Sequence, residues 1–147
     1  MKQLLPSPEA SPYARGMAWS LDTRIPLTFC TVAPLGDGVA TALLVEAPPA
    51  PLPAGAVAQV SFFPGPSHSP ACGCCGGRSG AEAALDRLFE ARVRALCGWF
   101  DRVLVIVETP EAAAEVAAAL REDAATAARF RLVPEPASAH PEVPAPD

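Results

Sequence analysis

Apolar residues gather in short runs along this chain, and strand-like runs alternate with helical ones. Residues 25–32 are rich in β-branched and aromatic side chains, which predicts a first strand. A turn at Gly36-Asp37-Gly38 follows, and residues 39–46 are predicted to form a short helix. Four prolines between positions 48 and 53 predict an extended linker, and the apolar run 56–63 predicts a second strand.

The second half has stronger periodicity. Five apolar residues recur at helical spacing over residues 81–97, and Glu90 can pair with Arg94 one turn later on the opposite face. Residues 103–107 are all apolar, which is typical of a strand buried on both faces in the middle of a parallel sheet. Thr109 and Pro110 then predict the start of a helix that runs to about position 121. A short helix near position 124 and an edge strand over residues 129–133 complete the pattern.

Alternating strands and helices predict a layered α/β domain with a small, mainly parallel sheet flanked by helices. We expect this domain to cover residues 25–133, after a loosely ordered arm over residues 1–24 and before a proline-rich, disordered tail over residues 134–147. Ligands of such sheets bind at the carboxyl ends of the strands. The Gly36 turn, the cysteine-containing loop of residues 65–80 and Glu108 are all predicted to lie at that end.

The cysteine-containing loop carries the most specific chemistry in the sequence. Cys72, Cys74 and Cys75 place three of the five cysteines within four positions, and three thiolates can converge on a soft cation such as Zn²⁺ or Cu(I). His68, four residues before Cys72, is a candidate for the fourth ligand. Alternative interpretations are an inherited loop without a ligand, a redox pair that would need a strained vicinal disulfide, and an iron–sulfur site that lacks a well-placed fourth thiol. The isolated Cys30 and Cys97 are predicted to be small buried hydrophobes.

Composition narrows the choice of partner and compartment. The net charge of −5 and the lack of a dense Lys/Arg patch argue against nucleic acid as a partner. The sequence contains no run of about 18 apolar residues, so it predicts no membrane-spanning helix. The first residues break into prolines before an apolar core forms, which does not resemble a secretory signal, so we expect a cytoplasmic protein. In a reducing cytosol, clustered cysteines favour metal binding over structural disulfides.

Five short motifs occur in the order found in one known family. They are Ile25-Pro26-Leu27-Thr28, Cys72-Gly73-Cys74-Cys75, Phe100-Asp101-Arg102-Val103, Glu108-Thr109 and Ala128-Arg129-Phe130-Arg131-Leu132. Because the motifs occur in this order, the chain resembles the N-terminal half of the CobW-type GTPases, which are relatives of HypB and UreG and act as metal chaperones. The resemblance covers residues 24–133. The resemblance implies a truncated P-loop NTPase-like fold and a zinc site, or a site for a similar thiophilic metal, on Cys72, Cys74 and Cys75. It also implies that Glu108 binds the metal or supports its ligands, and the alternative is a carboxylate that only caps the start of a helix.

The same resemblance exposes a degenerate nucleotide site. A working phosphate loop needs a lysine for the β/γ-phosphates and a hydroxyl for Mg²⁺. The aligned segment ends in Gly36-Asp37-Gly38-Val39-Ala40, so Val39 replaces the lysine and Ala40 replaces the hydroxyl. Asp37 adds a negative charge where phosphates would lie, and the single lysine of the chain is the distant Lys2. The segment that reads guanine in the family is also missing.

We therefore expect a metal-binding accessory protein that is a pseudo-GTPase rather than an enzyme, with no bound nucleotide. Its partner would be a second copy of the chain, a full-length CobW-type GTPase or a client that needs the metal. An alternative function is a protein-interaction module whose metal loop is vestigial, and a third is a residual GTP-binding protein.

Overall fold

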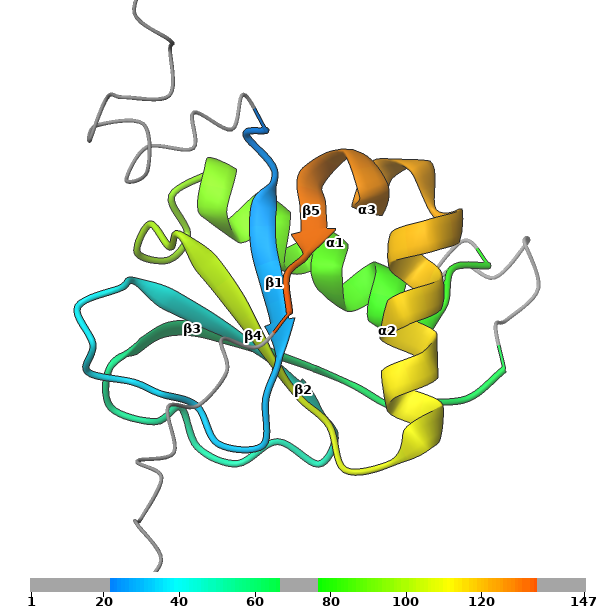
Figure 1. Cartoon of the computed structure of the whole chain (residues 1–147), viewed down its shortest axis with the longest axis horizontal. Helices are drawn as coiled ribbons and strands as arrows, with labels where there is room; N and C mark the ends of the chain where they lie inside the picture. Colours follow the sequence, from blue (N-terminus) through cyan, green and yellow to red (C-terminus); the bar gives the residue numbers. More distant parts are fainter. Residues whose placement is uncertain (1–21, 67–76, 135–147) are drawn as a thin grey trace, which may run out of the picture.

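The computed structural model describes residues 22–66 and 77–134. These residues form a five-stranded sheet and three helices (Figure 1). In chain order these are β1 (Ile25–Phe29), β2 (Thr41–Glu46), β3 (Ala56–Phe62), α1 (Gly80–Val93), β4 (Arg102–Ile106), α2 (Pro110–Glu122), α3 (Ala124–Arg129) and β5 (Phe130–Leu132). The predicted arm over residues 1–24 and the tail over residues 134–147 lie almost entirely outside the described residues.

The sheet has the strand order β3-β2-β4-β1-β5, and all its pairings are parallel. The predicted α/β class and the central position of the 103–107 run are confirmed, since β4 lies between β2 and β1. Val103, Leu104 and Val105 are at most 3% exposed, as expected for a strand covered on both faces. The predicted edge strand also forms, as β5.

The prediction of a helix over residues 39–46 is wrong, because this segment forms β2. Alanine and leucine favour helices in isolation, but β2 lies between β3 and β4 and buries four consecutive residues, Thr41 to Leu44. Burial on both faces leaves no polar stripe for a helical surface, so tertiary pairing outweighs local propensity. The linker with prolines at positions 48–53 contains no helix or strand, as predicted.

The three helices begin at side-chain caps and cover one face of the sheet. Ser79 and Glu82 form a reciprocal capping box at the start of α1, and Thr109 accepts a hydrogen bond from Ala112 N at the start of α2. Helix α1 ends at Val93, earlier than the predicted Cys97, because Ala95 adopts a left-handed conformation with φ 54°. The predicted Glu90–Arg94 pair is present at 3.9 Å.

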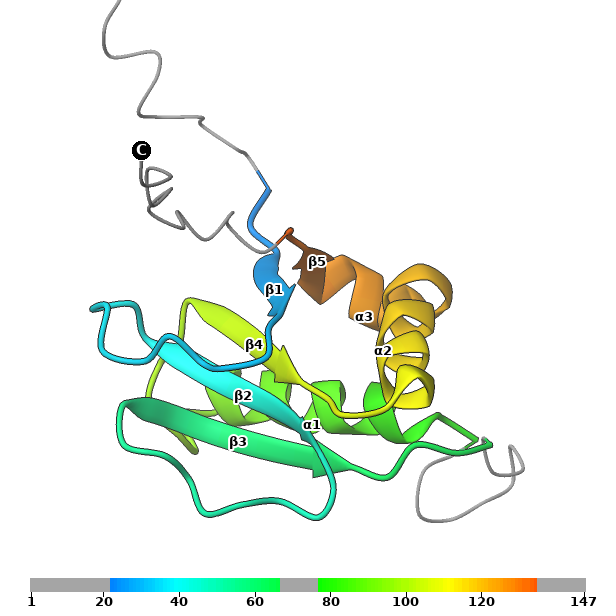
Figure 2. The same cartoon turned by 60° about the horizontal axis from the view of Figure 1, so that its bottom comes forward.

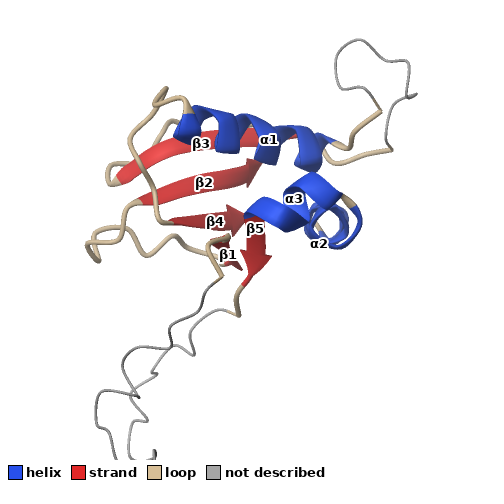
Figure 3. Cartoon of the chain, turned by 90° about the horizontal axis from the view of Figure 1, so that it is seen from above, coloured by secondary structure: helices blue, strands red, loops and turns tan. Residues whose placement is uncertain are grey.

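The direction of the crossovers explains why the two faces differ. The connections from β3 to β4 through α1, and from β4 to β5 through α2 and α3, cross the sheet in one direction. Right-handed crossovers therefore place these helices on the same face (Figures 2 and 3). The connections from β1 to β2 and from β2 to β3 run the other way and contain loops instead of helices. Leu43 and Leu104 are buried but do not belong to the core cluster that includes the helices, and Gln59 Nε2 donates a hydrogen bond to Ala50 O, in the loop between β2 and β3, at 2.7 Å.

Candidate functional site

At the carboxyl ends of the strands, the Glu46 carboxylate connects β2 with the start of α2 by hydrogen bonds to Glu108 and Thr109, an arrangement we call the latch. One oxygen of Glu46, the last residue of β2, accepts hydrogen bonds from Glu108 N at 2.7 Å and Thr109 N at 3.0 Å. The other oxygen accepts from Thr109 Oγ1 at 2.8 Å. These donors, led by the Glu108 N–H, lower the pKa of Glu46 below its ordinary value. The negative charge of Glu46 therefore lies at the positive end of α2.

Glu108 lies at the predicted rim, just after β4, with its side chain exposed. Its backbone N–H is held by Glu46, while Thr109 serves as the N-cap of α2. The predicted ligands Cys72, Cys74, Cys75 and His68 fall in segment 67–76, which lies outside the described residues. Within the described ranges, no three His, Cys, Asp or Glu side chains converge to hold a metal ion.

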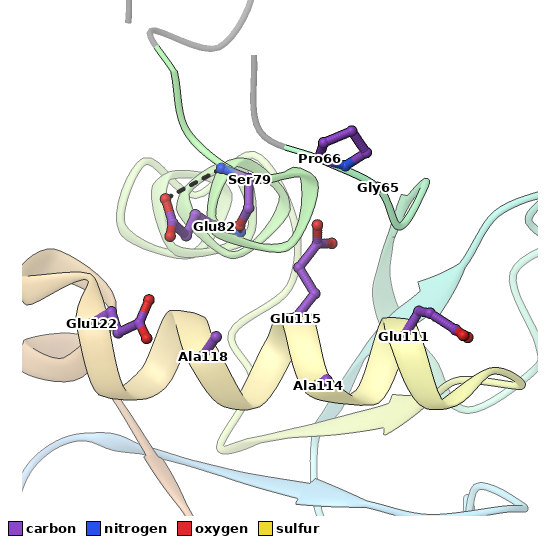
Figure 4. A pocket seen from close by; sticks show the side chains of 9 residues that line it. All are labelled: Gly65, Pro66, Ser79, Glu82, Glu111, Ala114, Glu115, Ala118 and Glu122. Atoms are coloured by element: carbon purple, nitrogen blue, oxygen red, sulfur yellow. Dashed lines mark hydrogen bonds between the residues drawn. The ribbon is translucent and has the colours of Figure 1, made fainter. Parts of the chain in front are cut away.

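A cavity of about 520 Å³ lies beside the two ends of segment 67–76 (Figure 4). The turn after β3 and the start of α1 form one wall, and the outer face of α2 forms the other. The lining residues are Gly65, Pro66, Ser79, Glu82, Glu111, Ala114, Glu115, Ala118 and Glu122. Because Pro66 and Ser79 line the same cavity, the cysteine segment leaves and rejoins the described fold at one place.

Among the carboxylates that line this cavity, Glu115 has a buried oxygen without a hydrogen-bond partner. It rises from α2 toward the start of α1 (Figure 4), and its Oε2 atom is buried with no hydrogen-bond partner among the described residues. Burial raises the pKa of Glu115, and the neighbouring charge of Glu82 adds to the shift. The backbone N–H groups of Gly65 and Ala81 oppose it. Glu82 differs, because its carboxylate accepts from Ser79 N at 3.3 Å within the capping box.

The Gly36-Asp37-Gly38 turn lies at the amino end of the sheet, so its predicted place at the carboxyl rim is wrong. Arg102, the first residue of β4, forms an ion pair with Asp37 at 2.9 Å and donates to Thr41 Oγ1 at 2.7 Å. The pKa of Asp37 is lowered first by the Val39 N–H and then by Arg102. The prediction failed because it assumed a helix after the turn, whereas the loop crosses the sheet and enters β2 at its amino end.

Val39 and Ala40 therefore lead into a strand. A phosphate loop uses the N–H groups at the start of the following helix, and the described loop ends in no helix. Of the predicted site residues, the structure places Glu108 at the carboxyl rim and residues 36–40 at the opposite end.

Sequence reasoning missed Glu46, Arg102 and Glu115. The first two would have followed from assigning residues 41–46 as a strand beside β4. Glu46 would then lie at the carboxyl end of that strand, near Thr109, and Arg102 would lie at the amino end of β4, beside Thr41. Glu115 lies one turn after Glu111 and on the same helical face, but the sequence did not show that this face borders the turn at Gly65. No protein-family model, curated protein or solved structure matches the chain.

Proposed function

We propose that this chain is a metal-binding accessory protein of CobW-like descent that holds Zn²⁺ or a similar thiophilic ion through Cys72, Cys74 and Cys75. The observation that carries the proposal is the Cys-x-Cys-Cys cluster, in a segment that connects β3 with α1. The described ends of this segment, Pro66 and Gly77, follow the carboxyl end of a parallel strand and precede a capped helix. Ligand sites of α/β sheets occur at such positions.

The donor chemistry fits a soft divalent cation. Thiolates are the preferred ligands of Zn²⁺ in tetrahedral sites, and three of them leave one coordination position. His68, Glu108, water or a side chain of a partner would fill that position. An open position suits a protein that passes its metal to a client, whereas a site closed by four protein ligands suits a structural role.

The all-parallel layered fold is compatible with a P-loop NTPase-like half-domain, and three features support a pseudo-GTPase. Val39 and Ala40 occupy the positions of the phosphate-binding lysine and the Mg²⁺ hydroxyl. The loop that carries them enters a strand at the amino rim. The positive end of α2 is already occupied by the Glu46 carboxylate. A cytoplasmic location, and a full-length CobW-type GTPase or a metal-requiring client as partner, belong to this proposal. Among the described residues, no helix combines the length and apolar character of a membrane span.

Cobalt substitution tests the metal site directly. Under reducing conditions, Co²⁺ should bind at about one equivalent with sulfur-to-metal charge-transfer and tetrahedral d–d bands. Cys74→Ser and Cys75→Ser should lose these bands, whereas His68→Ala should weaken binding less. Cys97→Ser is the matched control, because Cys97 packs beside the core at the far end of α1, and it should keep both bands.

Binding should release protons and weaken at low pH, since thiolates are the ligands. A wild-type chain without a charge-transfer band at neutral pH would refute the metal proposal. The alternative of an interaction module with a vestigial loop would then take its place.

A further inference from the structure

The outer edge of β3 is the longest unpaired strand edge in the described fold. β3 ends the sheet order and extends over seven residues, whereas β5 at the other edge has three. Residues 47–77, which include β3, contain no Asp, Glu, Lys or Arg. Natural edge strands are commonly protected by charges or prolines within the strand, and β3 has neither.

Backbone pairing shows which groups of β3 point outward. Phe62 O accepts a hydrogen bond from Ala47 N, so the N–H and C=O groups of Phe62 face β2. Because these groups alternate in direction along a strand, those of Ser61 and Gln59 face away from the sheet. Arg87 of α1 donates to Ser61 O at 3.2 Å, so a flexible side chain occupies one outward acceptor of the edge.

Exposed apolar side chains lie near both ends of this edge. Phe63, directly after β3, is 76% exposed. At the other end of the strand, a Cβ atom placed on Gly98 would lie 3.4 Å from Val57 Cβ, so the turn after α1 packs against the beginning of β3. Leu96 and Trp99 flank Gly98 and are 74% and 59% exposed.

We propose that β3 pairs with β3 of a second copy of this chain, antiparallel and about a two-fold axis at Gln59. Antiparallel pairing sets the end of one strand beside the beginning of its partner, so Phe63 of each copy approaches Leu96 and Trp99 of the other. Gln59 then faces its own equivalent, and no charged residue of β3 opposes another. The surface is self-complementary, as a two-fold interface requires. This inference does not rest on metal binding.

Proline at position 59 is the decisive perturbation. Gln59→Pro removes an outward N–H that β2 does not use, so the monomer fold should persist while the edge loses its donor. Gln59→Ala is the matched control, because it also loses the side-chain bond to Ala50 O but keeps the backbone N–H. Both should keep the wild-type circular dichroism spectrum.

Sedimentation of the full chain, with reductant and chelator present, should show a two-chain species for wild type and Gln59→Ala. Gln59→Pro should sediment at 15.2 kDa. Phe63→Glu should weaken the dimer at least tenfold, and adding Leu96→Lys should restore part of the loss, because the two side chains meet across the axis. Arg87→Ala should tighten it about fivefold, since the bond to Ser61 O no longer competes.

A wild-type chain that stays monomeric at about 0.5 mM, well above a micromolar dissociation constant, would overturn the proposal. So would a Gln59→Pro chain that still dimerises. Either result leaves the cobalt bands unaffected, so the dimer and the metal site succeed or fail separately.

Discussion

The unsatisfied carboxylate of Glu115 should limit stability at neutral pH, and Glu115→Gln should relieve this cost. The folded structure raises the pKa of Glu115, mainly by burial. For such a group the folded state is not penalised below the ordinary carboxyl pKa, and the penalty appears as the pH rises through the raised value. The substituted glutamine side chain would carry no charge, yet its amide oxygen could still accept from the Gly65 and Ala81 N–H groups.

The expected gain in stability is estimated from Glu115 Oε2, the buried oxygen without a hydrogen-bond partner. A buried polar atom without a partner costs about 1–3 kcal/mol, and more when it is charged. The glutamine amide would still bury a polar atom at this place, so only the part of the cost that is due to the charge is relieved. The lower end of the range therefore applies, also because the Glu115 side chain as a whole is only half-buried. We therefore expect Glu115→Gln to increase the free energy of unfolding by about 1 kcal/mol at neutral pH. For a domain of this size the melting temperature should rise by roughly 4 °C.

Urea unfolding with chelator and reductant, at about pH 7.5 and about pH 4, measures this effect on each side of the titration. Glu111→Gln is the matched control, since Glu111 lies on the same face of α2 one turn earlier but is exposed, and its effect should stay within about 0.5 kcal/mol. The gain in Glu115→Gln should largely vanish at the lower pH. A loss of stability at neutral pH, or an equal gain at both pH values, would refute the assignment of the cost to a buried charge.

Three further predictions concern the latch, the core and the nucleotide. Glu46→Gln should lower the melting temperature at neutral pH, but much less below the folded pKa of Glu46, because a lowered pKa stabilises the fold only while the carboxylate is ionised. The control Glu108→Gln, at an exposed neighbour, should change the melting temperature little. A loss in Glu46→Gln that does not depend on pH would contradict this role of the charge. Leu44→Ala should lower the free energy of chemical unfolding by about 2–5 kcal/mol, because Leu44 is fully buried. Leu132 is 55% exposed, so Leu132→Ala should change this free energy by no more than about 0.5 kcal/mol, and similar losses in both variants would refute the core assignment. Millimolar GTP with Mg²⁺ should leave the melting temperature unchanged, and a saturable rise would show that a nucleotide site survives.

Most of the fold could be predicted from local signals. The Thr109-Pro110 pair fixed the start of α2, and the all-apolar run at 103–107 identified the central strand. β2 could not be predicted from its own residues, since its strand conformation depends on neighbours that are distant in sequence. Thr41 pairs with Ala56 on one side and with Arg102 on the other.

The error in β2 also displaced part of the predicted site. Treating residues 39–46 as a helix put the Gly36 turn at the carboxyl rim, whereas Asp37 is held by Arg102 at the amino rim. Glu108 needed only the end of β4, and its position was predicted correctly. Side-chain environments such as that of Glu115 depend on how two helices approach one turn, which periodicity does not encode.

The sheet order has a consequence for how the chain can assemble. β1 comes first in sequence, yet both its neighbours come late: Leu27 pairs with Val103, and Ile25 pairs with Phe130. Only β2 and β3 are neighbours both along the chain and in the sheet. During synthesis, β1 must therefore remain unpaired with its own sheet until β4 has emerged, and its other edge stays open until β5 follows. Pairing between strands so distant in sequence slows folding. Among the strands of the described sheet, β1 waits longest for its partners, so its apolar residues are open to premature association during this time.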